Sequence, residues 1–222
     1  MSRSVVLGNT PRCERCRLAP RWCICDAAES IDCPFQVDVL VHHREFWRPT
    51  STGRLINRVI PSSRSHVFRP NVTPAQDEVV QSGHPLWVLH PRGEPLPAGP
   101  APAGLKVLLL DGSWREAAGM MPLVEPWGRS ISLPMTGFSR YWLREQRSEG
   151  RYSTIEALLF LLNAFGLHPE HERLRLQFEL HVYAGLRARG AKALAEEFLA
   201  TSPVREAFPE LLEKLEQRRP RI

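Results

Sequence analysis

Four cysteines near the start of the chain have the spacing of a metal site. The motif is C-x2-C-x6-C-x-C, formed by Cys13, Cys16, Cys23 and Cys25. Four thiolates satisfy tetrahedral zinc, and a C-x2-C pair aims two sulfurs at one ion. We therefore predict that residues 1–33 form a zinc-binding knuckle, with unligated reduced thiols as the alternative. Because four protein ligands leave no open coordination position, this zinc should stabilise the fold and take no part in catalysis.

Basic residues accompany this cluster. Arg12, Arg15, Arg17 and Arg21 alternate with the ligands along the chain. Two interpretations stay open for them, namely contact with RNA phosphates and an ordinary solvated surface. The fifth cysteine, Cys33, lies outside the motif and is predicted to be a bystander.

A second group of candidate residues follows an apolar run. In "LKVLLLDGSWREAAGMM", residues 105–121, the predicted strand ends on Asp111. Ligands in parallel α/β sheets bind beyond the carboxyl ends of strands, where this carboxylate is expected. Gly112 permits a tight turn, and Ser113 can cap the next helix. The alternative is that Asp111 and Ser113 only cap this helix while Trp114 packs in the core.

The elements that must position these residues alternate along the first part of the chain. Strands are predicted at 35–43, 65–69, 85–91, 105–110 and 130–133. Helices are predicted at 52–60, 73–83 and 115–121, and then at 153–166, 169–190, 192–200 and 202–217. In the second of these helices we expect Thr73 to be the cap and Gly83 to end the helix. Residues 91–104 are rich in proline and glycine and are expected to form a surface loop. Alternating strands and helices over 35–133 predict a largely parallel sheet that is covered on both faces.

Length and composition limit the broad class. The chain has 222 residues, a net charge of +5 and a pI near 9.2, which fits a nucleic-acid partner without requiring one. No apolar run approaches the roughly 20 residues of a membrane helix, and the first residues have no apolar signal core. We expect a cytoplasmic protein without membrane contact, in which thiols stay reduced and clustered cysteines indicate metal.

Several motifs in order resemble the DTW-domain family, the tRNA-uridine aminocarboxypropyltransferases related to the SPOUT superfamily. The family motif Asp-x-Thr-Trp is matched by residues 111–114, with serine in place of threonine. "HHREFWRPTSTGRLI" is similar to the family's His-x-x-Glu and Asn-Thr-Gly-Arg-Leu, with Ser51 where the family has asparagine. "LHP" at 89–91 and "WLREQRSEGRYSTIEAL" are similar to two further family segments, and the cysteine cluster resembles the family's zinc knuckle.

The resemblance implies a fold and a reaction. The fold would be an α/β SPOUT-like, mostly parallel sheet with a trefoil knot. This catalytic domain would span 34–222, with helical additions from about residue 153. The reaction would transfer the 3-amino-3-carboxypropyl group of S-adenosylmethionine to N3 of a tRNA uridine and release methylthioadenosine. Asp111 could accept the N3 proton or attract the sulfonium, and the sequence leaves both roles open. Ser113 and Trp114 complete the candidate catalytic motif.

The resemblance also implies the residues that bind the cofactor, S-adenosylmethionine. These are Thr52, Gly53, Leu89, Pro91, Leu133, Arg144, Ser153, Thr154 and Glu156. "STIE" at 153–156 also reads as a capping box, which is compatible with a ligand role because a helix N-terminus presents free N–H groups to an anion. Leu158, Leu159, Leu161 and Leu162 are predicted to be helix core. A Glu45–arginine pair is preferred over a second metal site at His42, His43 and Glu45.

Five arginines are candidates for RNA contact. Arg140, Arg144, Arg147 and Arg151 are spaced four, three and four apart, so on a helix they would form one basic stripe. Arg144 is instead assigned to the cofactor by resemblance, which leaves Arg140, Arg147 and Arg151, together with Arg54 and Arg58. A solvated charged face is the alternative.

Two other functions remain open from the sequence. One is a SPOUT-type RNA methyltransferase that uses the same cofactor. The other is a non-enzymatic zinc-knuckle protein that binds RNA. We expect tRNA as the partner and no obligatory protein partner.

Overall fold

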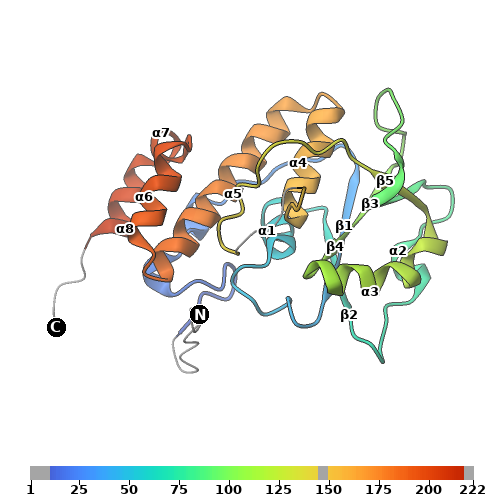
Figure 1. The fold of residues 1–222 in the computed structure, drawn as a ribbon, viewed down its shortest axis with the longest axis horizontal. Helices are drawn as coiled ribbons and strands as arrows, with labels where there is room; N and C mark the ends of the chain where they lie inside the picture. The colour runs from blue at the N-terminus through green and yellow to red at the C-terminus, as the bar shows by residue number, and fades with distance from the viewer. Residues whose placement is uncertain (1–10, 145–149, 218–222) are drawn as a thin grey trace.

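A computed structural model describes residues 11–144 and 150–217 and has one parallel sheet between two layers of helices (Figure 1). In the described chain the strands are β1 (Gln36–His42), β2 (Arg64–Phe68), β3 (Leu86–Pro95), β4 (Lys106–Asp111) and β5 (Arg129–Ser132). They pair in the order β2-β1-β4-β3-β5, and all these pairs are parallel. The predicted mixed α/β fold with a parallel sheet is confirmed. The trefoil knot stays a prediction, because strand order and register do not define how the chain is threaded.

Both faces of the sheet are buried, as the alternation of strands and helices predicts. Side chains alternate along a strand, so Val39 and Leu109 belong to one core cluster while Leu40 and Leu108 belong to the other. The first cluster is covered by the helices α1 (Thr52–Val59), α4 (Thr154–Ala164) and α5 (His168–Ala188). The second is covered by α2 (Gln76–Val79) and α3 (Trp114–Val124). Leu158, Leu159, Leu161 and Leu162 of α4 are buried, which confirms them as helix core.

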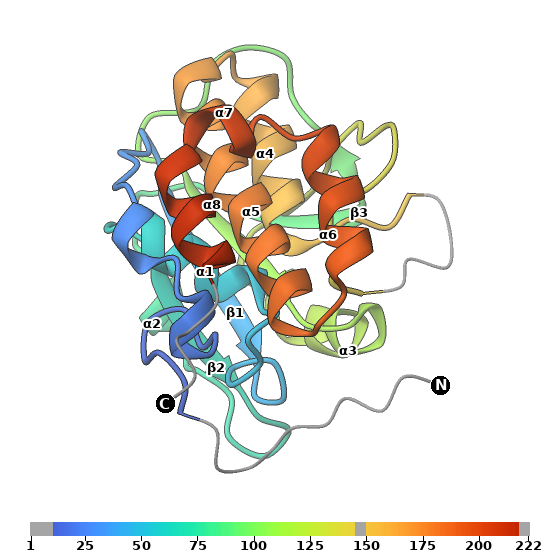
Figure 2. The same cartoon turned by 90° about the vertical axis from the view of Figure 1, so that its left-hand side faces the viewer.

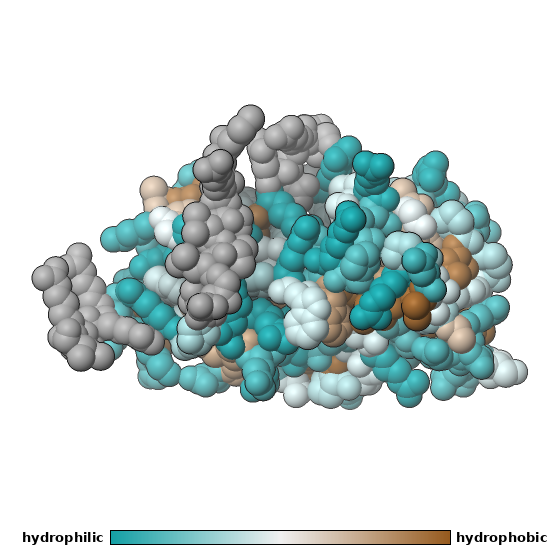
Figure 3. Space-filling view, turned by 90° about the horizontal axis from the view of Figure 1, so that it is seen from below, coloured by the Kyte–Doolittle hydropathy of each residue, from teal (hydrophilic) through white to brown (hydrophobic). Residues whose placement is uncertain are grey.

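The last helices pack on α5 and lie away from the sheet (Figures 1 and 2). They are α6 (Lys192–Ala200), α7 (Val204–Ala207) and α8 (Pro209–Glu216). Among the described helices, none is both long enough and apolar enough to cross a lipid bilayer. Figure 3 shows one face of the molecule. Its described residues are mostly hydrophilic, with small separate apolar patches.

The cysteine-rich segment shares the core of the α/β unit. It contains two short 3-10 turns, η1 (Pro20–Trp22) and η2 (Cys25–Ala27). Leu18, Ile24 and Ile31 are buried in the same cluster as the residues of α1, α4 and α5. The Gln177 side chain on α5 also donates a hydrogen bond to the carbonyl of Ala27 at 2.7 Å. The knuckle is therefore anchored on α5 by apolar packing and by a hydrogen bond.

A charged network lies inside the sheet. Asp38 on β1 is fully buried and accepts hydrogen bonds from His66 and Gln36, each at 2.9 Å. The Lys106 ammonium lies 3.5 Å from the same carboxylate and donates to the carbonyl of Val79 at 2.7 Å. Because buried charges are costly unless paired, these contacts allow an acid and a lysine in otherwise apolar strands.

Two predicted boundaries were wrong. The helix expected over 73–83 is only α2, which is capped by Ala75 and not by Thr73. Val79 is the only buried residue in this range, so little apolar surface supports a longer helix. The loop expected from residue 91 begins later, because β3 resumes at Glu94 after a bulge and pairs again with β5.

The condition for an arginine stripe, a helix through Arg140–Arg151, is not met by its described residues. Arg140, Arg144 and Arg151 lie in non-helical chain, and Arg147 lies outside the described residues. The segment is held by other elements instead, since the Arg140 N–H donates to the Glu156 carboxylate of α4 at 2.7 Å. The three described arginines, Arg140, Arg144 and Arg151, therefore do not share one helix face.

Candidate functional site

A cavity of about 690 Å³ opens at the carboxyl edge of the sheet. It lies beyond the ends of β4, β3 and β5 and is bordered by the start of α4. The lining residues that the sequence had indicated are Thr52, Leu89, Pro91, Asp111, Ser113, Trp114, Leu133, Arg144, Arg151, Ser153 and Thr154. The fold thus gathers segments from five parts of the chain around one space.

Asp111 is buried in this cavity wall and is held by two hydroxyl groups. The Ser51 hydroxyl donates to its Oδ2 at 2.7 Å, and the Thr154 hydroxyl donates to its Oδ1 at 2.8 Å. A carboxylate oxygen has two acceptor positions, so each oxygen retains one that these hydroxyl groups do not occupy. Asp111 therefore does not cap α3. It links the start of α1 to the start of α4 and presents a fixed negative charge to the cavity.

Gly53 makes this arrangement possible by its small size. A Cβ atom at this position would lie 2.8 Å from the Asp111 carboxyl carbon and 2.8 Å from Val39. Gly53 is not among the residues that line the cavity. The structure thus places this predicted cofactor residue behind Asp111, where it allows the first turn of α1 to approach the carboxylate.

The turn after Asp111 is a helix cap. The Ser113 hydroxyl accepts the Glu116 N–H at 3.3 Å, and the Glu116 carboxylate accepts the Ser113 N–H at 2.8 Å. Glu116 also lies 3.3 Å from the His42 ring at the end of β1. The capping interpretation of Ser113 is therefore confirmed, although the residue also lines the cavity.

Trp114 does not pack in the core. Its side chain is 38% exposed and lines the cavity. The guanidinium carbon of Arg151 lies 5.7 Å from the centre of the indole ring. Within the described chain, Trp114 and Arg151 thus form one aromatic and basic border of the opening.

A second border is formed by Arg144, which is ion-paired with the buried Glu45 and donates to the Thr50 hydroxyl at 3.3 Å. Glu45 is also paired with Arg48. The predicted Glu45–arginine pair is therefore confirmed. Tyr141 donates its hydroxyl hydrogen to the Thr50 carbonyl, and burial raises its pKa to about 12, so it stays protonated. These bonds hold the segment between β1 and α1, which contains Glu45 and Thr50, beside the cavity.

Glu156 joins α4 to the preceding loop and does not line the cavity. Its carboxylate accepts the N–H and the hydroxyl of Ser153, both at 2.7 Å, and also the hydroxyl of Ser139 at 2.9 Å. Since these groups occupy the buried carboxylate, the structure places Glu156 as a support of the helix start. Ser153 and Thr154 remain at the cavity.

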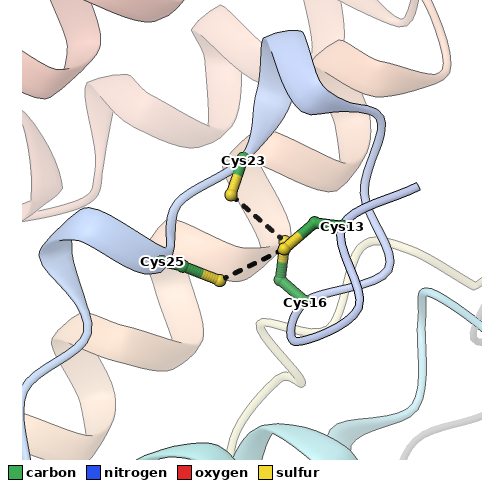
Figure 4. A group of neighbouring side chains, drawn as sticks. All are labelled: Cys13, Cys16, Cys23 and Cys25. Carbon is green, nitrogen blue, oxygen red and sulfur yellow. Dashed lines mark hydrogen bonds between the residues drawn. The ribbon is translucent and has the colours of Figure 1, made fainter. Parts of the chain in front are cut away.

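The four cysteines converge beside α1 and α5 (Figure 4). Their sulfur atoms all lie within 4.8 Å of one another. The Cys13–Cys25 and Cys16–Cys23 sulfur separations are 3.6 and 3.8 Å. Zinc–sulfur bonds of about 2.3 Å in tetrahedral geometry require sulfurs about 3.8 Å apart. This arrangement can therefore hold a metal ion such as zinc.

The thiols differ in their surroundings. Burial raises the pKa of Cys13, but backbone N–H groups and neighbouring thiols outweigh it and lower the value to about 6. Cys33 is separate from the cluster, and burial raises the pKa of its thiol to about 11. Cys33 thus fits the predicted bystander.

The predicted RNA-binding arginines are not all available at the surface. Arg58 is partly buried. It lies close enough to the sulfur atoms of Cys16, Cys23 and Cys25 for electrostatic interaction with them. Its Nε and one Nη are buried without a hydrogen-bond partner in the described protein. The structure therefore places Arg58 under the knuckle as a neighbour of the cysteine cluster, and this corrects its assignment to an RNA-facing surface.

The side chains of Arg54 and Arg140 also bind other groups of the protein. Arg54 donates to the carbonyl of Phe46, and Arg140 is 3.1 Å from Glu179 and 2.8 Å from the hydroxyl of Thr201. Arg144 and Arg151 both line the cavity. Arg144 is ion-paired with Glu45, whereas Arg151 forms no ion pair with any described residue.

Some cavity residues were not among those predicted from the sequence. Thr50 and Tyr141 are brought in by side-chain bonds between distant segments. His90 and Arg92 line the cavity because they lie in the bulge of β3, where the ladder shifts between Leu89 and Glu94. The glycine and proline content of residues 91–104 predicted an irregular loop. It did not predict that the start of this segment turns toward the cavity.

The fold and the site define an α/β protein with a cavity at the carboxyl edge of a parallel sheet and a four-cysteine cluster. The model of the DTW domain matches residues 10–184. The chain therefore belongs to the DTW-domain family, which is consistent with an enzyme that modifies tRNA. The match includes the cysteine cluster, the whole sheet and most of α5, and it ends before α6. A search of solved structures found no match.

Proposed function

We propose that this protein transfers the 3-amino-3-carboxypropyl group of S-adenosylmethionine to N3 of a uridine in tRNA and releases methylthioadenosine. The observation that carries the proposal is the cavity around Asp111, whose volume of about 690 Å³ is in the range of sites for small molecules and cofactors. Membership of the DTW-domain family supports tRNA as the substrate.

The lining supports a donor that is both apolar and charged. Leu89, Ile131 and Leu133 provide apolar wall, which suits an adenosine and the methyl group on sulfur. Ser153 and Thr154 lie at the start of α4, where the helix dipole favours an anion such as the donor's carboxylate. S-adenosylmethionine supplies a carbon that its own sulfonium activates, so the protein has to position the reactants.

Asp111 would act at the reacting centre. The bond formed joins uridine N3 to the terminal carbon of the transferred group, while the bond from this carbon to sulfur breaks and its electron pair stays on sulfur. The N3 proton must leave, and a free acceptor position on Asp111 can receive it. The two hydroxyl donors hold the carboxylate in one orientation for this contact. The same negative charge also attracts the sulfonium.

The cysteine cluster would hold zinc as a structural ion. All four ligands come from the protein, so the ion has no open position for a substrate. The buried and unpaired N–H groups of Arg58 fit this proposal, because four thiolates on one zinc ion leave a net negative charge beside them. Zinc would thus hold the knuckle against α5.

The test is a reaction of the protein with S-adenosylmethionine and unmodified tRNA, followed by mass spectrometry of nucleosides and small molecules. We expect a uridine with an added aminocarboxypropyl group and release of methylthioadenosine. Asp111→Asn keeps the shape but removes the charge, and it should slow transfer by about 10²–10⁴-fold. The affinity for S-adenosylmethionine should fall much less, because the donor loses only the attraction of this charge to its sulfonium. Asp77→Asn, on the exposed surface of α2, is the matched control.

Other products would reject the proposal. S-adenosylhomocysteine with a methylated base would indicate a methyltransferase. Absence of both products across several tRNA pools, with RNA binding retained, would indicate a binding protein. Wild-type transfer by Asp111→Asn would remove this carboxylate from the reaction.

A further inference from the structure

Trp47 is an exposed aromatic residue in a fixed position. It lies between β1 and α1, and its side chain is 63% exposed. The guanidinium carbon of Arg17 lies 4.7 Å from its ring centre, and the Phe46 ring meets it edge-on at 4.9 Å and 86°. Apolar rings of this size are normally buried, so a ring supported by two neighbours yet open to solvent suggests a binding surface.

Arg17 has a backbone conformation that normally favours glycine. Its φ is +62°, and among the described residues it is the only non-glycine residue with positive φ. The Arg17 N–H donates to the Cys13 carbonyl at 2.8 Å, and its own carbonyl accepts from Arg12 at 3.1 Å. The knuckle thus imposes the conformation. An arginine at this position is disfavoured by the backbone, which indicates that its side chain has a role.

The surroundings of Trp47 are positively charged. Arg12, Arg44 and Arg48 are exposed in the same two segments, and Arg48 is the one of these that is ion-paired, with Glu45. Among the described residues, no carboxylate forms an ion pair with Arg12, Arg17 or Arg44. An aromatic face with unpaired cations around it has the composition of a surface for single-stranded nucleic acid.

Trp47 is close along the chain to residues of the cavity. Thr50, three residues after Trp47, lines the cavity, and the next residue, Ser51, donates to Asp111. Three residues span at most about 10 Å, so Trp47 lies close to the opening. A chain bound at Trp47 could therefore continue into the site.

We propose that Trp47, supported by Arg17, stacks on an unpaired base of the RNA substrate next to the base that enters the cavity. Arg12 and Arg44 would contact the adjoining phosphates. This inference rests on the proposed function and adds a surface that the knuckle and the β1–α1 segment form together. Recognition of unpaired RNA bases by stacking on aromatic side chains is common, and every base offers a face for it.

Three variants test the stacking surface by the anisotropy of labelled unmodified tRNA. Trp47→Leu keeps an apolar side chain but removes the aromatic face, and it should weaken binding by about 5- to 150-fold. Trp47→Phe should remain near wild type. Arg17→Gly suits the positive φ, so it should leave the melting temperature unchanged or raise it while weakening tRNA binding.

Leu194→Ala and Arg173→Ala are the controls, because both side chains are exposed on the helices α6 and α5. Both should bind tRNA like wild type. The Trp47 variants should leave the affinity for S-adenosylmethionine unchanged, since Trp47 does not line the cavity.

The outcomes separate this inference from the proposed function. If transfer occurs and Trp47→Leu has the wild-type KM and Kd for tRNA, the stacking surface is rejected while the function stands. If no transfer occurs but Trp47→Leu weakens tRNA binding, the surface stands and the reaction is rejected. If Trp47→Leu changes only the sedimentation of the protein, the surface binds a second copy and the RNA proposal is wrong.

Discussion

Gly53→Ala should displace the carboxylate that the cavity is built around. The added Cβ would lie 2.8 Å from the Asp111 carboxyl carbon, from its Oδ2 and from the Val39 side chain. Ordinary Cβ contacts begin at 3.4 Å, so Asp111, Val39 or the first turn of α1 must move by about 0.6 Å. The neighbours have little freedom, because Val39 is fully buried in the sheet and Asp111 is held by Ser51 and Thr154.

The size of the effect follows from this crowding. Inserting a carbon into a packed interior costs about 1–3 kcal/mol. In a chain of this length each kcal/mol lowers the melting temperature by about 2–4 °C, so we expect a decrease of roughly 2–12 °C. A displacement approaching 1 Å at a reacting group can reduce turnover by about 10²-fold. Activity should therefore fall far more than stability alone explains.

The assay compares thermal unfolding and transfer rate for Gly53→Ala and Gly119→Ala. Gly119 is in α3, and a Cβ there meets nothing within 4 Å. Its substitution should stabilise the helix by about 0.5–1 kcal/mol and leave activity unchanged. If Gly53→Ala keeps both the wild-type melting temperature and the wild-type rate, the argument from close approach is wrong.

Two further predictions concern charges that the fold buries. Asp38→Asn leaves Lys106 without its anion and should lower the free energy of unfolding by about 3–5 kcal/mol near neutral pH. Burial raises the pKa of Asp38, but the hydrogen bond from His66 and the charge of Lys106 outweigh it and lower the pKa. This stabilisation is therefore present above the ordinary carboxyl pKa of about 3.9 and is lost as the pH falls through the lower folded value. In urea unfolding, the difference from wild type should shrink at acidic pH, and a constant difference would contradict the linkage. Arg58→Met should weaken zinc retention by about 10–100-fold in a chelator assay, whereas Arg21→Met on the exposed knuckle should not. Equal zinc release from both variants would exclude Arg58 as a neighbour that stabilises the metal.

Local patterns identified most of the fold. The apolar runs that end at His42 and Asp111 predicted β1 and β4, because a strand buried on both faces needs a nearly continuous apolar sequence. The leucines of α4 repeat at helical spacing and are buried as expected. The spacing of the four cysteines predicted a cluster, since C-x2-C fixes two sulfurs by local geometry alone. Where the apolar pattern was weak, as at Thr73, the predicted helix was too long.

The sequence by itself determined the strands, most of the helices, the cysteine cluster and the position of Asp111 at a strand end. Each of these depends on residues that are close together along the chain. Only the tertiary structure decided that Ser51 and Thr154 hold this carboxylate and that Gly53 supports it from behind. It also turned Arg58 toward the cysteines and Arg17 toward Trp47. These contacts join residues that are far apart along the chain, and their geometry depends on how the helices pack on the sheet, which no local pattern contains.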